Sequence, residues 1–176
     1  MEIQLEIAAV FVMPPLIDSV VVLRKAGEWE KKLFLINTDR DAALAITEGV
    51  GKKLWQQPVA HDLLKNCIEK LGGHIQKVVI GEFKDGISHA SIYLDCGNDR
   101  TESINSRPVD ALALAVRTHC PIYMEERVFE EGKMELPAEE KMGWQQSGLA
   151  EKMEKMGPEE LLEFLKDIDP SKIPQA

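Results

Sequence analysis

Apolar and polar residues alternate near the start of the chain, and this period of two predicts a β-strand over residues 3–11. A valine-rich segment at 19–23 and an apolar segment at 32–36 predict two further strands. The residues between these two segments are mostly polar and include Gly27, so we expect a hairpin turn there. The first part of the chain is therefore predicted to be β-structure.

The middle of the chain has the pattern of a three-stranded antiparallel meander. Apolar residues dominate 74–83 and alternate with polar ones over 87–96, and a turn leads from there into a last strand at 101–105. Asp85-Gly86 separates the first two segments and is a strong signal for a two-residue hairpin. Strands joined by such tight turns pair with their neighbours in sequence.

Three segments have the periodicity of helices. Residues 39–48 carry an alanine-rich apolar face, and residues 62–71 place apolar residues on one face and polar residues on the other. Residues 109–116 are apolar nearly all round, and Pro108 suits the first helical position. We expect this third helix to be buried on most sides, with a short strand at 122–124 after it.

These elements predict the α+β fold class: an antiparallel or mixed, twisted and pseudo-barrel-like sheet of about five to seven strands, packed with about three helices. We place this domain at residues 1–131. Strand signals end there, so residues 132–176 are predicted to be a linker followed by an amphipathic C-terminal helix over 158–168. The apolar stripe of that helix comprises Leu161, Leu162, Leu165 and Ile168.

Composition and charge restrict the classes of function. With 176 residues, 44% of them hydrophobic and 29% charged, the chain has the composition of a globular protein. Its net charge of −9 argues against tight non-specific nucleic-acid binding, which depends on Lys and Arg, but is compatible with a carboxylate-built metal site. The three cysteines lack CxxC spacing, and no signal peptide or long apolar segment is seen. We therefore expect a cytoplasmic protein that does not bind a membrane.

Candidate chemistry lies at the predicted starts of two helices. Asp62 and Asp110 are candidate ligands of a divalent cation, Mg²⁺ or Mn²⁺, because such hard cations bind oxygen and keep several waters. His61 is a candidate general acid or base, since histidine as a residue type exchanges a proton near neutral pH. Arg107 is a candidate for holding a phosphate and stabilising charge that develops on it.

Each of these residues also has a structural interpretation. An acid in the first turn of a helix interacts favourably with the helix dipole, which accounts for Asp62 and Asp110 without any chemistry. Arg107 could equally form an ion pair with Asp110, three residues along the same helix. No P-loop, GxSxG, HExxH or GxGxxG motif accompanies these residues, so the pattern of residue types leaves both interpretations open.

The order and spacing of several motifs resemble the bifunctional nuclease family. The most specific is Ser106–Arg117 running into Pro121–Met124, and the others are Pro58–Leu64, Gly72-Gly73, Val78–Ile80 and Asp85-Gly86. The resemblance spans roughly residues 1–131. It implies a compact, often self-associating α+β domain and, as described for some members, degradation of both DNA and RNA. The positions that match recurrent positions of the family are His61, Asp62, Arg107, Pro108 and Asp110.

Two functions from different classes follow. The first is a metal-dependent nuclease that hydrolyses phosphodiester bonds in DNA, RNA or both, with His61, Asp62, Arg107 and Asp110 as its catalytic residues. The alternative is a non-catalytic module that assembles with itself or binds a partner or small ligand, in which these four side chains form a buried structural network. The resemblance and the expected unpaired sheet edges both favour a homo-oligomer, most simply a twofold dimer.

Overall fold

The computed structural model describes six ranges of the chain, namely residues 1–13, 18–27, 32–51, 57–84, 87–97 and 99–135. The predicted Asp85-Gly86 turn, most of the predicted linker and the predicted C-terminal helix lie outside the described residues. Within the described ranges, no helix is both long enough and sufficiently apolar to cross a membrane.

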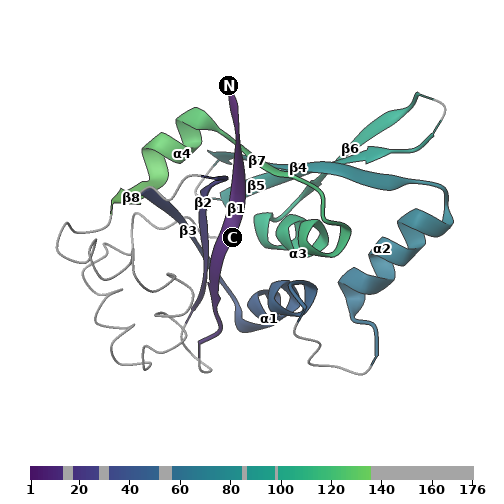
Figure 1. Ribbon diagram of the computed structural model, residues 1–176, viewed down its shortest axis with the longest axis horizontal. Coiled ribbons are helices and arrows are strands. Elements are labelled where there is room, and N and C mark those ends of the chain that lie inside the picture. Colours follow the sequence, from purple (N-terminus) through teal and green to yellow (C-terminus); the bar gives the residue numbers. More distant parts are fainter. Residues whose placement is uncertain (14–17, 28–31, 52–56, 85–86, 98, 136–176) are drawn as a thin grey trace.

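The strands of the described residues form one mixed sheet (Figure 1). They are β1 (Glu2–Phe11), β2 (Ser19–Lys25), β3 (Lys32–Thr38), β4 (His74–Lys84), β5 (Ile87–Asp95), β6 (Thr101–Ser106), β7 (Ile122–Glu125) and β8 (Lys133–Glu135). Their order across the sheet is β6-β5-β4-β7-β1-β2-β3-β8, and only the β4–β7 pair among them is parallel. The predicted α+β class with a mixed sheet is confirmed. In the described part of the chain, β6 and β8 are the two ends of the strand order, and the predicted barrel-like closure is not formed.

The predicted hairpin and the predicted meander are both confirmed. β2 and β3 pair in antiparallel register, with Val21 opposite Ile36 and Leu23 opposite Phe34. These four side chains are at most 1% exposed, because alternate positions of both strands face the same core. β4, β5 and β6 follow one another as antiparallel neighbours.

The described helices are α1 (Arg40–Gly49), α2 (Ala60–Lys70), α3 (Pro108–Thr118) and α4 (Glu126–Gly132). Figure 1 shows α3 beneath β4, where it packs against α1, α2 and the strands β4 and β5. Its apolar sequence predicts burial on most sides, and its residues from Val109 to Ala115 are buried except for Asp110. The central helix therefore places one acidic side chain at the junction of three helices.

Small residues let α1 and α3 approach closely. Ala42 and Ala43 of α1 are buried against the core. A Cβ atom on Gly49 would lie 2.2 Å from Cγ2 of Val116, which is closer than real Cβ contacts allow. Glycine at the end of α1 is thus needed for the two helices to lie at this distance.

The sequence pattern did not predict α4 or β8. Phe129 of α4 is fully buried and stacks on Phe34, with 6.2 Å between the ring centroids. β8 pairs with β3, and Lys133 lies opposite Phe34. The predicted domain end at residue 131 therefore lies inside α4, and the sheet continues to Glu135. With β8, the sheet of the described residues has eight strands, above the expected five to seven.

The apolar stripe of α2 is largely exposed. No residue of this helix is buried, and Leu63, Leu64 and Leu71, the last just after the helix, are 61%, 47% and 88% exposed. Ile68 packs only partly against the core. The helix is held at its first turn instead, where His61 and Asp62 both contact α3.

Candidate active site

Two helices bring their first turns together to form the candidate site. α3 begins after Arg107, with Pro108 at its first position, and Asp110 lies in its first turn. Proline suits this position because the missing N–H has no partner inside a helix start. α2 begins at Ala60, which places His61 in its first turn beside α3.

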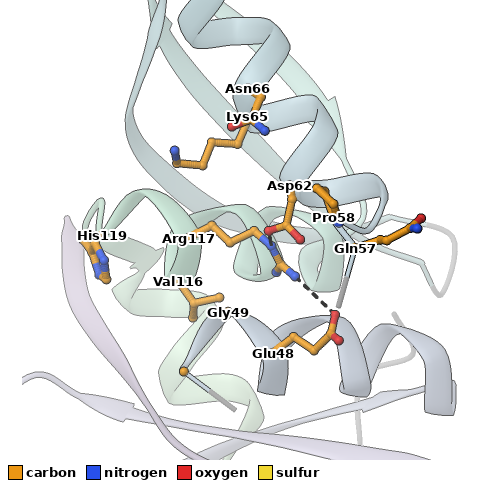
Figure 2. Close-up of a pocket in the computed structure, with 11 residues that line it drawn as sticks. Glu48, Gly49, Gln57, Pro58, Asp62, Lys65, Asn66, Val116, Arg117 and His119 are labelled. Atoms are coloured by element: carbon orange, nitrogen blue, oxygen red, sulfur yellow. Dashed lines mark hydrogen bonds and ion pairs between the residues drawn. The ribbon is translucent and has the colours of Figure 1, made fainter. Parts of the chain in front are cut away.

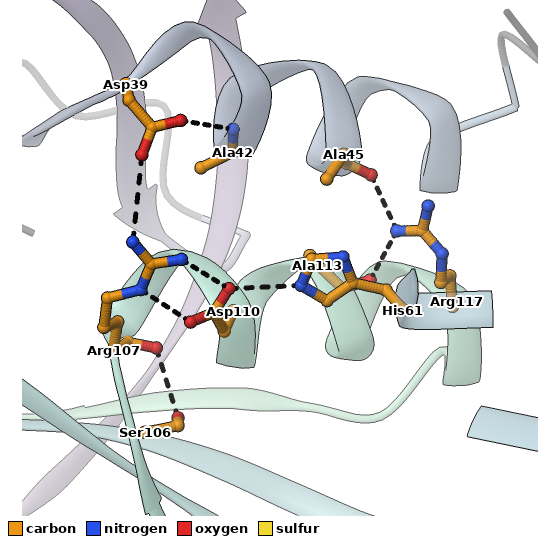
Figure 3. A network of polar contacts seen from close by, with 9 residues as sticks. All are labelled: Asp39, Ala42, Ala45, His61, Ser106, Arg107, Asp110, Ala113 and Arg117. Carbon is orange, nitrogen blue, oxygen red and sulfur yellow. Dashed lines mark hydrogen bonds and ion pairs between the residues drawn. The ribbon is translucent and has the colours of Figure 1, made fainter. Parts of the chain in front are cut away.

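His61, Arg107 and Asp110 contact one another and form what we call the His61–Asp110–Arg107 cluster (Figure 3). Nε2 of His61 lies 3.2 Å from Oδ1 of Asp110. Arg107 donates from Nε to Oδ2 of Asp110 at 2.7 Å and from Nη2 to Oδ1 at 3.1 Å. Asp110 is thus held by a two-point contact with a guanidinium on one side and by an imidazole on the other.

Asp39 extends the cluster toward α1. Its Oδ1 accepts a hydrogen bond from the backbone N–H of Ala42 at 2.8 Å, which caps the start of α1. Its Oδ2 lies 3.8 Å from Nη1 of Arg107. The Arg107 guanidinium therefore faces two carboxylates from two different helices.

The environment of Asp110 keeps its carboxyl group ionised. Partial burial acts to raise the pKa of Asp110, but hydrogen bonds from Arg107 and His61 outweigh it and hold that pKa below its ordinary value. The same contact with Asp110 raises the pKa of Arg107. At neutral pH the cluster accordingly contains a fixed anion, a fixed cation and an imidazole in contact with the anion.

The cluster lines a pocket of about 580 Å³ that reaches solvent. The side chain of Arg107 is 55% exposed, whereas that of His61 is only 18% exposed. Asp39, just before α1, and Glu48 of α1 also line this pocket. A ligand in this pocket can therefore meet a positive group and a positioned histidine together.

Asp62 does not join this cluster. Its Oδ1 accepts a hydrogen bond from Nε of Arg117 at 2.7 Å, and its Oδ2 accepts one from the backbone N–H of Val59 at 3.0 Å. Burial acts to raise the pKa of Asp62, but the contacts with Arg117 and Val59 lower it overall. Asp62 lines a second pocket, of about 650 Å³, on the Arg117 side of the helix junction (Figure 2).

The fit of a divalent cation to these residues is poor. Among the described residues, no group of three or more His, Cys, Asp or Glu side chains is placed to hold a metal ion. Both carboxylate oxygens of Asp110 and both of Asp62 already accept hydrogen bonds, and the two residues line different pockets. The assignment of Asp62 and Asp110 as ligands of Mg²⁺ or Mn²⁺ stays a prediction.

Arg117 is the residue that the sequence analysis missed. It lies seven residues, about two helical turns, after Asp110, so these two side chains share one face of α3. Polar residues with this spacing inside an otherwise apolar helix indicate that polar side chains contact one another where the helices pack. That signal was present in the sequence, and it identifies the residue to which Asp62 binds.

Comparisons with known proteins relate the chain to one family and to two relatives. The family described as the bifunctional nuclease domain matches residues 21–137. Two uncharacterised proteins from two strains of Mycobacterium tuberculosis are each 29% identical over 137 residues, which is 77% of this chain and 79% of theirs. The matched family segment includes α1, α2 and α3 with the whole His61–Asp110–Arg107 cluster.

Proposed function

Because the chain belongs to the bifunctional nuclease domain family, we propose that it hydrolyses phosphodiester bonds in DNA or RNA at the His61–Asp110–Arg107 cluster. The observation that carries the proposal is a histidine held by a carboxylate next to a half-exposed arginine in one open pocket. Nuclease chemistry needs these two elements: a group that takes a proton from water and a cation that holds the phosphate.

Each residue of the cluster has a defined role in this reaction. Asp110 accepts from Nε2 of His61, which leaves Nδ1 as the nitrogen that takes a proton from the attacking water. The water oxygen forms a bond to phosphorus, the bond to the leaving oxygen breaks, and solvent supplies the proton that this oxygen needs. His61 then releases the proton it took from the water to solvent. Arg107 holds the non-bridging phosphate oxygens and stabilises the charge that grows on them.

Asp110 has a positioning role rather than a direct one. Its carboxylate fixes which nitrogen of His61 carries the proton and also holds the Arg107 guanidinium in place. Asn at position 110 would keep the shape of the side chain but lose the charge. We expect Asp110→Asn to change the pH profile of hydrolysis as well as its rate, which a purely structural contact would not do.

The test is a nuclease assay on the full-length protein with labelled single-stranded DNA and RNA, in Mg²⁺, in Mn²⁺ and in a chelator. We expect His61→Ala to lower the rate by about 10²-fold or more, the usual contribution of a general base. His74→Ala is the matched control, because the His74 side chain is 64% exposed on β4 and lies outside the cluster. Activity that survives in the His61→Ala/Asp110→Ala protein would contradict the proposal and indicate a contaminant.

Self-assembly is a second candidate function, and one observation favours it. Leu63, Leu64 and Leu71 leave an apolar surface exposed on and just after α2, and such surfaces mark sites of protein association. Light scattering on the full-length protein should then give the mass of a dimer, and Leu64→Ser should shift it toward the monomer. A monomer mass for the unaltered protein at high concentration would rule this out.

A further inference from the structure

The two strands at the ends of the strand order differ in how they are protected against pairing with another chain. Edge strands are normally short, charged, irregular or covered, because their unpaired N–H and C=O groups attract other strands. β8 has three residues, and two of them, Lys133 and Glu135, are charged. β6 has six residues, five of them exposed, pairs with β5 without a register shift, and contains neither lysine nor proline. β6 therefore lacks most of the features that protect an edge strand.

Three residues of β6 turn their backbone groups away from the sheet. The N–H of Cys96 donates to the carbonyl of Arg100 at 2.8 Å, which fixes the phase of the antiparallel ladder between β5 and β6. Because the residues of such a strand form hydrogen bonds alternately to one side and to the other, the groups of Thr101, Ser103 and Asn105 point outward. In the described part of the chain no strand lies beside them, and Figure 1 shows β6 at the upper right and β8 at the left.

Ile104 adds an exposed apolar side chain to this edge. It lies opposite Ile92 of β5, which is 5% exposed and belongs to the core, so Ile104 points to the helix side of the sheet. Ile104 is nevertheless 48% exposed, because β6 is the last strand on this side among the described residues. The apolar layer of the core thus continues to the rim of the sheet, where it meets solvent.

We propose that β6 is a dimer interface, in which it pairs antiparallel with β6 of a second copy and Ile104 lies opposite the partner's Ile104. This register buries the exposed isoleucine, and a twofold axis passes between the two side chains. Because the backbone groups of Ile104 point toward β5, this pair is of the non-hydrogen-bonded kind, in which side chains approach most closely. On either side of it, Ser103 lies opposite the partner's Asn105, and each such pair exchanges two backbone hydrogen bonds.

The side chains of β6 are complementary to one another in this register, which favours a second copy over an unrelated peptide. Glu102 is the charged residue of the strand, and it lies opposite the partner's Ser106, a small uncharged side chain. The Glu102 carboxylate also lies 3.7 Å from Nε of Arg100 in its own chain. Like charges therefore do not meet across the axis, and the isoleucine finds an apolar partner.

The interface leads directly into the candidate site. Arg107 follows β6 in sequence, and in this register it lies beside the partner's Thr101. Because the twofold axis is perpendicular to the sheet, the helices of both copies lie on one side of a continuous sheet, and so do the two His61–Asp110–Arg107 clusters. This inference rests on the second candidate function, self-assembly, and assigns it a contact other than the leucines of α2.

An introduced cysteine tests the register. Two Cα atoms in a non-hydrogen-bonded antiparallel pair are about 4.5 Å apart, within the range that a disulfide spans. Full-length Ile104→Cys should therefore form a covalent dimer on oxidation, in a Cys67→Ser background because Cys67 is the exposed native cysteine. The matched control, Glu102→Cys in the same background, should not, since its two copies lie four residues apart along the strands. A covalent dimer through Glu102→Cys, or none through Ile104→Cys, would overturn the assignment.

Light scattering on the full-length protein tests the assembly itself. Ile104→Lys brings two like charges together at the axis and should raise the dimer dissociation constant at least about 10-fold. Ser103→Pro removes an outward N–H without touching the ladder to β5 and should act in the same direction, with circular dichroism confirming the fold. Val50→Lys is the matched control, because Val50 is an exposed apolar residue outside β6. A dimer that both β6 variants leave unchanged would contradict the proposal.

Two further variants separate this inference from the proposed functions. A dimer that Leu64→Ser dissociates and Ile104→Lys does not would place self-assembly at α2 and overturn the assignment to β6. His61→Ala should lose nuclease activity and keep the dimer mass, because His61 lies outside β6. A monomer mass for the unaltered protein at high concentration would overturn the β6 interface and leave the nuclease proposal untouched.

Discussion

Two aspartate–arginine pairs anchor α3, and their arginines differ in burial. Arg107 donates from Nε to Asp110 and Arg117 donates from Nε to Asp62, both at 2.7 Å. The Arg107 side chain is 55% exposed, whereas the Arg117 side chain is 4% exposed. The same hydrogen bond from arginine Nε to an aspartate is thus made once by an arginine in contact with solvent and once by an arginine buried between the helices.

Because of this difference in burial, we assign a chemical role to Arg107 and a structural role to Arg117. An exposed ion pair contributes little to stability, so the Arg107–Asp110 pair can serve a chemical role at small cost to the fold. Arg117 also binds two backbone carbonyls, one on α1 and one on its own helix, and thereby joins α1, α2 and α3. Removing it would take one donor each from Asp62 and from these two carbonyls.

The largest expected effect comes from replacing the two arginines separately. Arg117→Met should lower the free energy of unfolding by about 3 kcal/mol, because it removes a buried guanidinium that donates to Asp62 and to two backbone carbonyls. Arg107→Met should lower it by less than about 1 kcal/mol, as is usual for exposed pairs. Urea denaturation of both proteins measures this, and equal losses would show that burial does not distinguish the two pairs.

A smaller effect is expected at the close approach of α1 and α3. Gly49→Ala should cost about 2 kcal/mol, because the added methyl group would overlap Val116 and force the helices apart. Val50→Ala is the control, since Val50 is 65% exposed. Adding Val116→Ala to the Gly49→Ala protein should restore part of the loss in thermal denaturation, and no restoration would place the strain elsewhere.

Acid should weaken the exposed pair through Asp110. The pKa of Asp110 is lower in the folded protein than its ordinary value, so the unfolded chain binds the proton more readily. The stabilisation from this carboxylate is therefore present above its ordinary pKa and is lost as the pH falls through the folded value. Melting temperatures measured from pH 7 down to pH 3 should fall less for Asp110→Asn than for the unaltered protein, and identical slopes would contradict this.

The smallest expected effect lies at the end of α3. His119 ends the helix in the left-handed conformation, with φ of 55° and ψ of 28°, which favours glycine. His119→Gly should therefore stabilise the protein by up to about 1 kcal/mol, and His119→Ala should not. Urea denaturation of both variants provides the comparison, and a stability loss in His119→Gly would mean that the imidazole itself contributes to packing.

The sequence predicted those parts of the fold that local patterns determine. α3 has an apolar run behind a proline, and the meander has alternating strands, so each is specified by its own residues. α4 and β8 escaped prediction because both are short and depend on contacts with Phe34 and its strand, which are distant in sequence.

The candidate site was predicted only in part, for a physical reason. His61, Arg107 and Asp110 come together as expected, but Asp62 binds Arg117. The rotation of α2 about its axis determines whether His61 or Asp62 lies near the start of α3. The apolar stripe of α2 does not fix that rotation, because Leu63 and Leu64 remain exposed.

The most direct test of the account is the activity and stability of one variant, Arg107→Ala, measured on the same preparation. We expect kcat/KM for phosphodiester hydrolysis to fall by about 10²-fold, the usual loss when one group that stabilises the transition state is removed. The melting temperature should stay close to that of the unaltered protein, because the pair is exposed. Full activity in Arg107→Ala would contradict the assignment of the His61–Asp110–Arg107 cluster as the active site.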